Sequence, residues 1–243
     1  MKKLALLGLT LFFTTTITAQ WGKRIKGNGN VVTIERSVGD YDAIAVSGWF
    51  DVDLVSGTEG ELTLRGEENL LAYIKTEIKD GKLTIKVKNG VNIKPSSWGR
   101  DGGIYITVPV ENINEVTLSG SGDVVGRKTI ETDNFKTNIS GSGDISLSVE
   151  AKTVKATMSG SGDINLDGRT SDLDVQVSGS GDIKAYELEA DYVTAQVSGS
   201  ADIKVTANKM LKARVSGSGD ISYRGNPEKI DTKTSGSGDI SKG

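Results

Sequence analysis

The stretch SGSGDI, residues 140–145, decides the fold that this sequence predicts, because the same six residues occur five times in a chain of 243 residues. Two variants, SGSGDV from Ser119 and SGSADI from Ser198, bring the number of copies to seven. Successive copies are separated by 21, 19, 19, 20, 18 and 19 residues. Self-similarity at a nearly constant period of this length is typical of a solenoid, in which each repeat forms one coil and contacts only its neighbours.

The residues on either side of each motif predict two β-strands. Before the motif at Ser178, the apolar residues Leu173, Val175 and Val177 are separated by single polar residues. This period of two predicts a strand with one buried face and one solvated face. The sixth residue of every motif is Val or Ile, as at Ile183, and in most copies another apolar residue follows two positions later. A second strand is therefore predicted to begin at the end of each motif.

Each coil is thus predicted to contain a strand, an SGSG corner, a second strand and a variable return loop such as residues 188–191. Successive coils would stack about 4.8 Å apart and pair in parallel. We predict an all-β chain folded as a single-stranded parallel β-helix with about 19 residues per coil. At this coil size, the chain is expected to form about eleven or twelve coils over a length of about 55 Å.

The N-terminal half is predicted to carry the same repeat in a degenerate form. The segment VSGWFDV, residues 46–52, keeps the register of the motif. Residues 67–74, EENLLAYI, predict one short helix that covers the end or the side of the stack. Because the ends of a solenoid must be capped, Trp49, Trp98 and Tyr105 are predicted to plug the first coils.

The chain is predicted to consist of a signal peptide at residues 1–19, a degenerate part of the β-helix at residues 20–118 and the regular repeat at residues 119–243. The last two segments are expected to form one continuous solenoid. The first segment combines Lys2 and Lys3 with an apolar run too short to span a bilayer, which is the plan of a secretory signal peptide. No second apolar stretch of membrane length follows. We therefore expect export to the periplasm, the outer surface or the extracellular medium.

Composition excludes several kinds of site and partner. The formal net charge is −3, and loss of the two lysines with the signal peptide leaves about −5, which argues against nucleic acid and anionic membranes as partners. The absence of cysteine excludes disulfides, thiolate nucleophiles and thiolate metal sites. The absence of histidine removes the commonest general base and transition-metal ligand.

The fifth residue of every motif is an aspartate, and these aspartates are the candidate binding residues. Stacking places them in one column, where neighbouring charges about 4.8 Å apart repel by about 0.9 kcal/mol in water. The sequence leaves two roles open: the carboxylates accept backbone N–H bonds of the Gly-Ser-Gly corner, or calcium ions lie between coils. One carboxylate per coil is few for an ion that takes roughly six to eight oxygens, so the structural role is favoured. The column consists of Asp123, Asp144, Asp163, Asp182, Asp202, Asp220 and Asp239.

The other motif positions predict how the corner is built. The second-position glycine never varies, which predicts a backbone conformation closed to other residues. The fourth position becomes Ala201 once, so this position is predicted to tolerate a Cβ atom. The third-position serine is small enough to be predicted to face inward.

Three segments resemble one known family. They are GNGNVVTIERSVGDYDAIAVSGWFDVDLVSG (27–57), GEENLLAYIKTEIKDGKLTIKVKNG (66–90) and IYITVPVENINEVTLSGSGDV (104–124). With the trailing motifs, they are similar to the head GIN-domain family of exported bacterial proteins, which are described as autotransporter adhesins. The resemblance implies a β-helical fold and an envelope or extracellular setting, and it implies no catalytic or binding residue.

We expect adhesion or scaffolding through multivalent contacts with cell-surface or matrix glycans or proteins, without catalysis or a cofactor. One alternative is a β-helix that binds or cleaves polysaccharide, although solvated or packing roles are favoured for its candidates Arg127, Arg169, Arg224, Tyr186 and Tyr192. Another alternative is a calcium-binding accessory protein that uses the aspartate column. An uncovered terminal coil would leave an open strand edge, so oligomers by end-to-end stacking are a further expectation.

Overall fold

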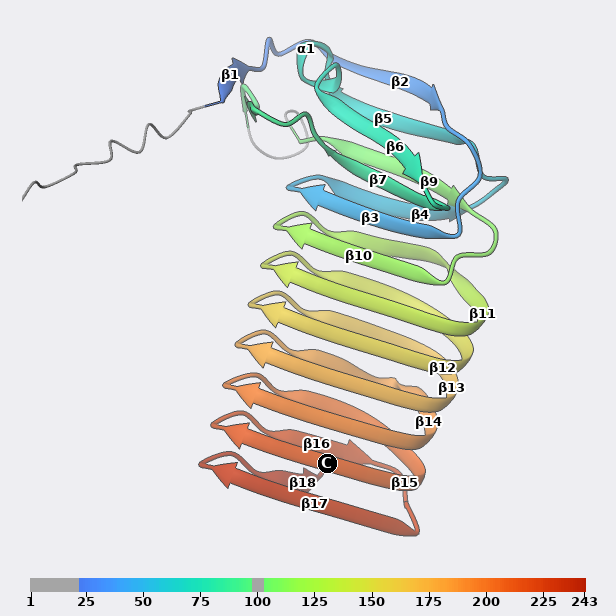
Figure 1. Ribbon diagram of the computed structural model, residues 1–243, viewed down its shortest axis with the longest axis vertical. Coiled ribbons are helices and arrows are strands. Elements are labelled where there is room, and N and C mark those ends of the chain that lie inside the picture. Colours follow the sequence, from blue (N-terminus) through green and yellow to red (C-terminus); the bar gives the residue numbers. More distant parts are fainter. Residues whose placement is uncertain (1–21, 98–102) are drawn as a thin grey trace, which may run out of the picture.

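The structure is a computed structural model that describes residues 22–97 and 103–243. Figure 1 shows a stack of long, parallel coils that carries a group of shorter strands at its N-terminal end. The predicted signal peptide and Trp98 lie outside the described residues. No helix within the described ranges is long and apolar enough to cross a membrane.

Each regular coil is almost a single strand. The strand begins after one motif, crosses one side of the coil, bends round the return and crosses the other side to the next SGSG corner. The side before the corner is called the front here, and the side after the corner is called the back. These strands are β11 (Val124–Gly141), β12 (Ile145–Gly160), β13 (Ile164–Gly179), β14 (Ile183–Gly199) and β15 (Ile203–Gly217).

The return is continuous strand, so the predicted return loop at residues 188–191 is wrong. Parallel pairing of β12 with β13 runs from Ile145 opposite Ile164 to Gly160 opposite Gly179, around the bend. Hydrogen bonds to the neighbouring coils hold the curved backbone extended, because parallel pairing satisfies its N–H and C=O groups around the bend. Irregularities in the pairing of β11, β13 and β14 accommodate coils that differ in length.

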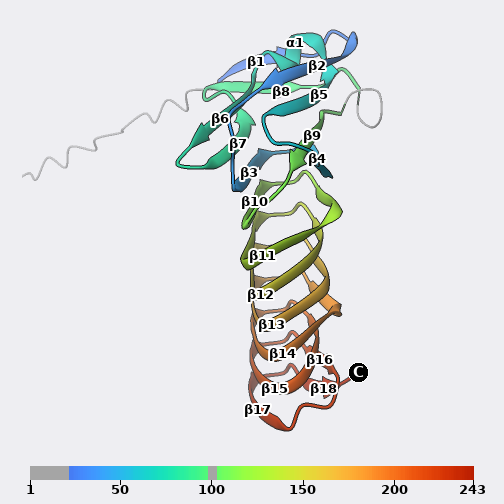
Figure 2. The ribbon, with the colours of Figure 1, turned by 90° about the vertical axis from the view of Figure 1, so that its right-hand side faces the viewer.

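The predicted parallel β-helix is confirmed, with about 19 residues per turn, but it has about seven turns rather than eleven or twelve. Figure 2 shows the narrow stack from its side. At the C-terminal end it closes with three short strands. They are β16 (Ile221–Arg224), β17 (Lys229–Gly236) and β18 (Ile240–Lys242).

The chain forms fewer turns because much of its N-terminal third pairs differently. Pairing is antiparallel between β2 and β5, between β5 and β9 and between β6 and β7, and β1 forms a separate two-stranded sheet with β8. The elements are β1 (Lys23–Lys26), β2 (Val31–Ser37), β5 (Glu61–Glu67), α1 (Glu68–Leu71), β6 (Ile74–Lys79), β7 (Lys82–Val87), β8 (Val91–Lys94) and β9 (Tyr105–Val110). Antiparallel neighbours need only short turns, such as the one at Asp80 and Gly81, so these strands do not require the coil period.

One coil in this region does follow the motif, as residues 46–52 predict. It consists of β3 (Ala43–Gly48) and β4 (Asp51–Ser56), which stack on β10 (Glu115–Gly120) and on the start of β11. Gly48 lies opposite Gly120, and Val52 lies opposite Val124. The degenerate segment is therefore in register with the regular repeat.

Side chains fill the inside of the coils. The inward residues of successive coils form columns, such as Ile145, Ile164 and Ile183, none of which is exposed. Phe50 and Phe135 are the largest of the fully buried side chains. Because one coil alone would leave these side chains in water, the hydrophobic contribution to stability depends on stacking.

The predicted helix is present but short, since α1 spans only four residues of the expected eight. Its Leu70 and Leu71 are buried. Beside it, the buried carboxylate of Glu67 accepts N–H bonds from Gly29 at 2.5 Å and Ser96 at 2.7 Å. Burial alone would raise the pKa of Glu67, but these hydrogen bonds outweigh it and lower the pKa below its usual range. Glu67 thereby links the segments that contain Gly29 and Ser96 to the end of β5.

The aromatic residues predicted to plug the first coils have different environments. The rings of Trp49 and Phe50 lie 5.6 Å apart between centroids, and Trp49 is partly buried against the core. Tyr105 is only half-buried on β9, where the Arg65 guanidinium lies 5.7 Å from its ring centroid.

The SGSG corner explains the invariant glycine. Second-position glycines have φ between +127° and +154°, which L-residues rarely adopt. A Cβ atom on Gly160 would also lie only 1.9 Å from the carbonyl oxygen of Gly141, in the preceding coil. The corners of successive coils therefore touch backbone to backbone.

The structure corrects two predictions about this corner. A Cβ atom on the fourth-position Gly162 would lie 1.9 Å from the carbonyl oxygen of Gly143. The coil that contains Ala201 therefore accommodates a side chain at the fourth position, but the coil of Gly162 does not. The fourth residue is the buried one, whereas third-position serines such as Ser161 are exposed. The Ser161 N–H donates to the Gly141 carbonyl at 2.9 Å, which holds the corner against the previous coil.

We predict that Gly160→Ala lowers the free energy of unfolding by about 2–4 kcal/mol, because it combines a strained φ with a clash between coils. Urea unfolding followed by circular dichroism measures this change. The matched control is Ser161→Ala in the same corner, which should change stability by less than about 0.5 kcal/mol because its side chain is exposed. Equal stability of the two variants would contradict the close approach of the corners.

Candidate functional site

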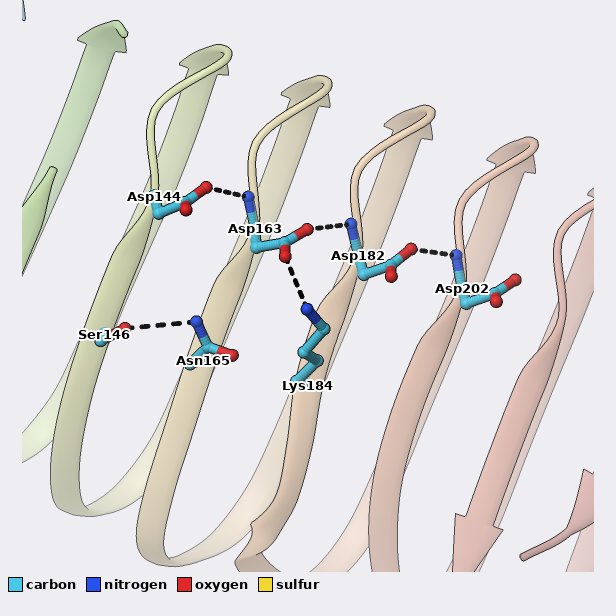
Figure 3. A network of polar contacts seen from close by, with 7 residues as sticks. All are labelled: Asp144, Ser146, Asp163, Asn165, Asp182, Lys184 and Asp202. Carbon is cyan, nitrogen blue, oxygen red and sulfur yellow. Dashed lines mark hydrogen bonds and ion pairs between the residues drawn. The ribbon is translucent and has the colours of Figure 1, made fainter. Parts of the chain in front are cut away.

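The structure brings the seven predicted aspartates into one column along the corner edge of the stack. Figure 3 shows four of them, Asp144, Asp163, Asp182 and Asp202, on successive coils. Each follows the fourth residue of its motif, where the chain leaves the corner and enters the next long strand. The side chains project beside the backbone of the adjacent coil.

A continuous ladder of hydrogen bonds runs through this column. From Asp144 to Asp239, the backbone N–H of each aspartate donates to Oδ1 of the aspartate one coil earlier, at N–O distances of 2.8–3.2 Å. In the opposite direction, the N–H of the residue after each aspartate donates to the backbone carbonyl of the next aspartate, as from Ile145 to Asp163 at 2.9 Å. The carboxylate thus takes the place of a peptide carbonyl where the chain turns.

This arrangement differs from the expected one in its donor. The carboxylate bonds the next coil, not the Gly-Ser-Gly backbone of its own corner. A hydrogen bond to a charged group stabilises by about 1.5–3 kcal/mol, whereas two neighbouring carboxylates repel by about 0.9 kcal/mol in water. The hydrogen bond is therefore the larger effect in every coil.

The column has an eighth member, which the sequence analysis did not include among its candidates. Asp51 in the degenerate coil accepts the N–H of Asp123 at 3.4 Å. Burial raises the pKa of Asp51, and the bond from Asp123 only partly opposes this. The register of VSGWFDV with the motif was the signal that could have identified it.

One lysine neutralises part of the column. Nζ of Lys184 donates to Oδ2 of Asp163 at 2.6 Å, as Figure 3 shows. Burial alone would raise the pKa of Asp163, but bonds from Lys184 and from the Asp182 backbone lower it below the usual range. The bond to Asp163 in turn raises the pKa of Lys184. In the same outward row, Asn165 donates to the Ser146 hydroxyl at 3.2 Å.

The donor geometry gives the calcium role no support. Within residues 22–97 and 103–243, no three acidic side chains lie close enough together to hold a metal ion. Each coil supplies one carboxylate, and in six coils one of its oxygens already accepts a backbone N–H bond. A calcium ion between two coils would lack most of its roughly six to eight oxygen ligands.

The three candidate arginines do not form one site. Arg127 pairs with Asp53 at 2.8 Å, and Arg169 approaches Glu189 at 3.5 Å. Arg224 lies over the ring of Tyr186, 4.0 Å from its centroid, and approaches Glu187 at 3.6 Å. The guanidinium groups therefore have separate acidic partners, as expected of solvated surface charges.

A hollow of about 690 Å³ lies on the front of the stack, and we call it the front groove. Each of its two walls is a row of side chains, one from each successive coil, in parallel register. The first row is Asn134, Thr153, Asp172, Tyr192 and Met210; the second is Lys136, Lys155, Asp174 and Thr194. Phe135, Val154 and Leu173 lie between the rows with their side chains buried.

Tyr192, a candidate of the polysaccharide alternative for which a packing role was favoured, is the exposed aromatic residue of the groove. It was expected to pack on a return loop, but it lies on β14 with 43 % of its surface exposed. The Lys209 ammonium lies 5.8 Å from its ring centroid and is held there by a 2.8 Å bond to Asp191. The signal was the register of coils, which places residue 192 in an outward row.

A family model described as "Putative auto-transporter adhesin, head GIN domain" matches residues 40–227. The crystal structure of a protein from Bacteroides fragilis, described as a "putative adhesin", is similar with a TM-score of 0.82 and 24% identity, over 90% of this chain and 99% of that one. A "putative lipid binding protein" from Parabacteroides distasonis gives a TM-score of 0.74 and 27% identity, over 91% and 100% of the two chains. A "putative adhesin" from the same species gives 0.72 and 24%, with the same coverage. No curated protein matches the chain.

We predict that Asp144→Ala lowers the free energy of unfolding by about 1–3 kcal/mol, because the Asp163 N–H loses its acceptor. Asp144→Asn keeps an acceptor oxygen and should lose less than half as much. Urea unfolding of both variants measures the effect, with Asp167→Ala as the control for an exposed aspartate outside the column. If the Ala variants at 144 and 167 are equally stable, the ladder does not contribute to folding.

We predict an acid-sensitive contribution from the bond between Lys184 and Asp163. The folded pKa of Asp163 is depressed, so its stabilisation is complete above the unfolded pKa, about 3.9, and is lost as pH falls through the folded pKa. Lys184→Met should therefore reduce stability at pH 7, by less than about 1 kcal/mol, and the difference from the parent should shrink below pH 4. Unfolding curves from pH 7 to pH 2 measure it. Lys204→Met, in the same row one coil on, should show no such pH dependence.

Proposed function

The chain belongs to the head GIN-domain family of adhesin-like proteins, and from this premise we propose that it is an exported protein that binds cell-surface or matrix partners without catalysis. The site of action in this proposal is the periplasm or the cell surface. The segments at residues 1–19, 20–118 and 119–243 act as signal peptide, N-terminal part and regular repeat.

The main support for this proposal is the parallel register of the outward-facing residues on the front of the stack. Parallel pairing repeats the same outward position in every coil, so polar groups lie at a fixed spacing on a continuous hydrogen-bonded support. Weak contacts that repeat on a rigid support add up through effective concentration. Such a surface suits adhesion to a partner that is itself repetitive.

Catalysis is less well supported by the same surface. The two large hollows are open to solvent, whereas catalytic groups work best in sites from which water is excluded. The arginines proposed for a lyase each have their own acidic partner. A polysaccharide is therefore better supported as a binding partner than as a substrate.

Lipid is a further ligand class, since one relative is described as a lipid binding protein. In this chain the inside of the coils is filled by side chains that are fully buried. A lipid would therefore have to bind on the outer surface.

Self-association is a separate part of the proposal. β17 is exposed along its whole length, and Ile230 in an inward position is 49% exposed. An open strand edge of this kind can pair with a second copy. Size-exclusion chromatography at rising protein concentration tests end-to-end stacking.

The binding test uses protein purified from the periplasm of an exporting host. We expect saturable binding to intact bacterial cells, matrix proteins or isolated envelope polysaccharides on coated plates, with the same binding in EDTA and in millimolar calcium. An unrelated solenoid protein of similar net charge is the control. Failure to bind any surface better than this control would refute adhesion, and binding that needs calcium would restore the metal role of the column.

A further inference from the structure

We propose that the front groove binds an uncharged polysaccharide chain that lies along the axis of the stack, an inference that rests on the adhesive function proposed above. The groove crosses successive coils instead of following one strand. Its first wall contributes one side chain from each of five coils, Asn134, Thr153, Asp172, Tyr192 and Met210. The coils are about 4.8 Å apart, close to the length of one hexose unit in an extended chain.

The chemistry of the walls fits a sugar. A hexose has an apolar face of C–H groups and a rim of hydroxyls. The exposed ring of Tyr192 offers an apolar platform with a polar end. The exposed amide of Asn134 and the carboxylate of Asp172 can exchange hydrogen bonds with hydroxyls, and a 2.7 Å bond from the Thr153 hydroxyl holds Asn134 in place.

The charges of the groove favour an uncharged ligand. Its lining contains two lysines, Lys136 and Lys155, and two aspartates, Asp172 and Asp174. Lys155 and Asp174 already pair with each other at 3.4 Å. An acidic glycan or a nucleic acid would need an excess of positive charge, and the whole chain carries −3.

Backbone pairing argues against an extended peptide in this groove. A peptide that adds to a sheet needs a free strand edge with unpaired N–H and C=O groups. On the front, the strands that line the groove pair on both sides with neighbouring coils, as β13 does with β12 and β14. Only side chains remain available there, which suits a ligand recognised through its hydroxyls and its apolar face.

The other large hollow lacks these features. It has about 680 Å³ at the return end and is lined by charged residues such as Glu150, Lys152 and Arg169. No aromatic side chain lines it. Unlike this hollow, the front groove combines an exposed aromatic ring with equal numbers of lysines and aspartates.

The experiment compares binding of the full protein and three variants to soluble dextran, mannan, xylan and β-glucan, with alginate and hyaluronan as acidic probes. Isothermal titration calorimetry measures affinity. Tyr192→Ala should weaken binding to the uncharged polymer at least about tenfold, whereas Tyr192→Phe, which keeps the ring, should stay within about threefold. The matched control is Tyr186→Ala, on the same strand but on the back, which should not change affinity.

A series of oligosaccharides of the bound polymer tests the orientation. Affinity should rise with length up to about five sugar units, because the first wall spans five coils. A rise in affinity that stops at one or two units would contradict contact with all five coils. Since Tyr192 is exposed, its variants should keep the parent melting temperature, which circular dichroism checks.

The outcomes separate this inference from the adhesive function. Binding to cells or matrix proteins without binding to any uncharged polymer overturns the groove assignment and leaves adhesion standing. Preference for alginate or hyaluronan, or unchanged affinity in Tyr192→Ala, also overturns it. Absence of binding to every surface and polymer refutes both proposals.

Discussion

The hydrogen bond from the backbone N–H of one aspartate to the carboxylate of the aspartate in the preceding coil is the interaction on which the regular stack depends. Parallel pairing satisfies the hydrogen bonds of the peptide groups along the strands, but the chain also turns sharply at a corner in every coil, where the peptide groups need other partners. At Asp144 and Asp163 the side chain supplies the acceptor that the turning backbone does not. The positive-φ glycine beside it lets the corners approach so closely that a Cβ atom would collide with the preceding coil. Carboxylate and glycine together keep the register from one coil to the next.

The fixed register of the coils arranges the surface residues in rows. Because equivalent positions of successive coils lie opposite each other, each outward-facing residue belongs to a row, and a row can contact a longer ligand than any single side chain can. The front groove exists for this reason: its walls are two rows, and the residues between them point into the core. Adhesion proteins gain from such repetition, since contacts that are individually weak act together on a repetitive partner.

Much of the corner could be predicted from the sequence, and parts of it could not. The invariant second glycine indicated a special conformation, and φ values above +120° confirm it. The inward position was assigned to the third residue, but the fourth is buried, as Phe50 and Ala201 in this position show. The register of residues 46–52 with the motif places Asp51 at the aspartate position, and the structure adds Asp51 to the column. For Tyr192 the sequence favoured packing over sugar contact, because an aromatic residue near a return commonly packs against its neighbours, and only the stacking of coils shows that its ring is exposed.

The sequence by itself determined the parallel solenoid, the coil length and the column of aspartates, because equal spacing of identical corners admits few other folds. It also determined the register of the degenerate coil at residues 46–52. The tertiary structure decided the number of turns, the continuous strand at the return, the donor to each carboxylate and the front groove. These features depend on which strands meet in space. Antiparallel strand pairs in the N-terminal third satisfy backbone groups without a fixed period, so dividing the chain length by the coil length overestimates the number of coils. A surface groove likewise belongs to neighbouring coils, not to any one segment of the chain.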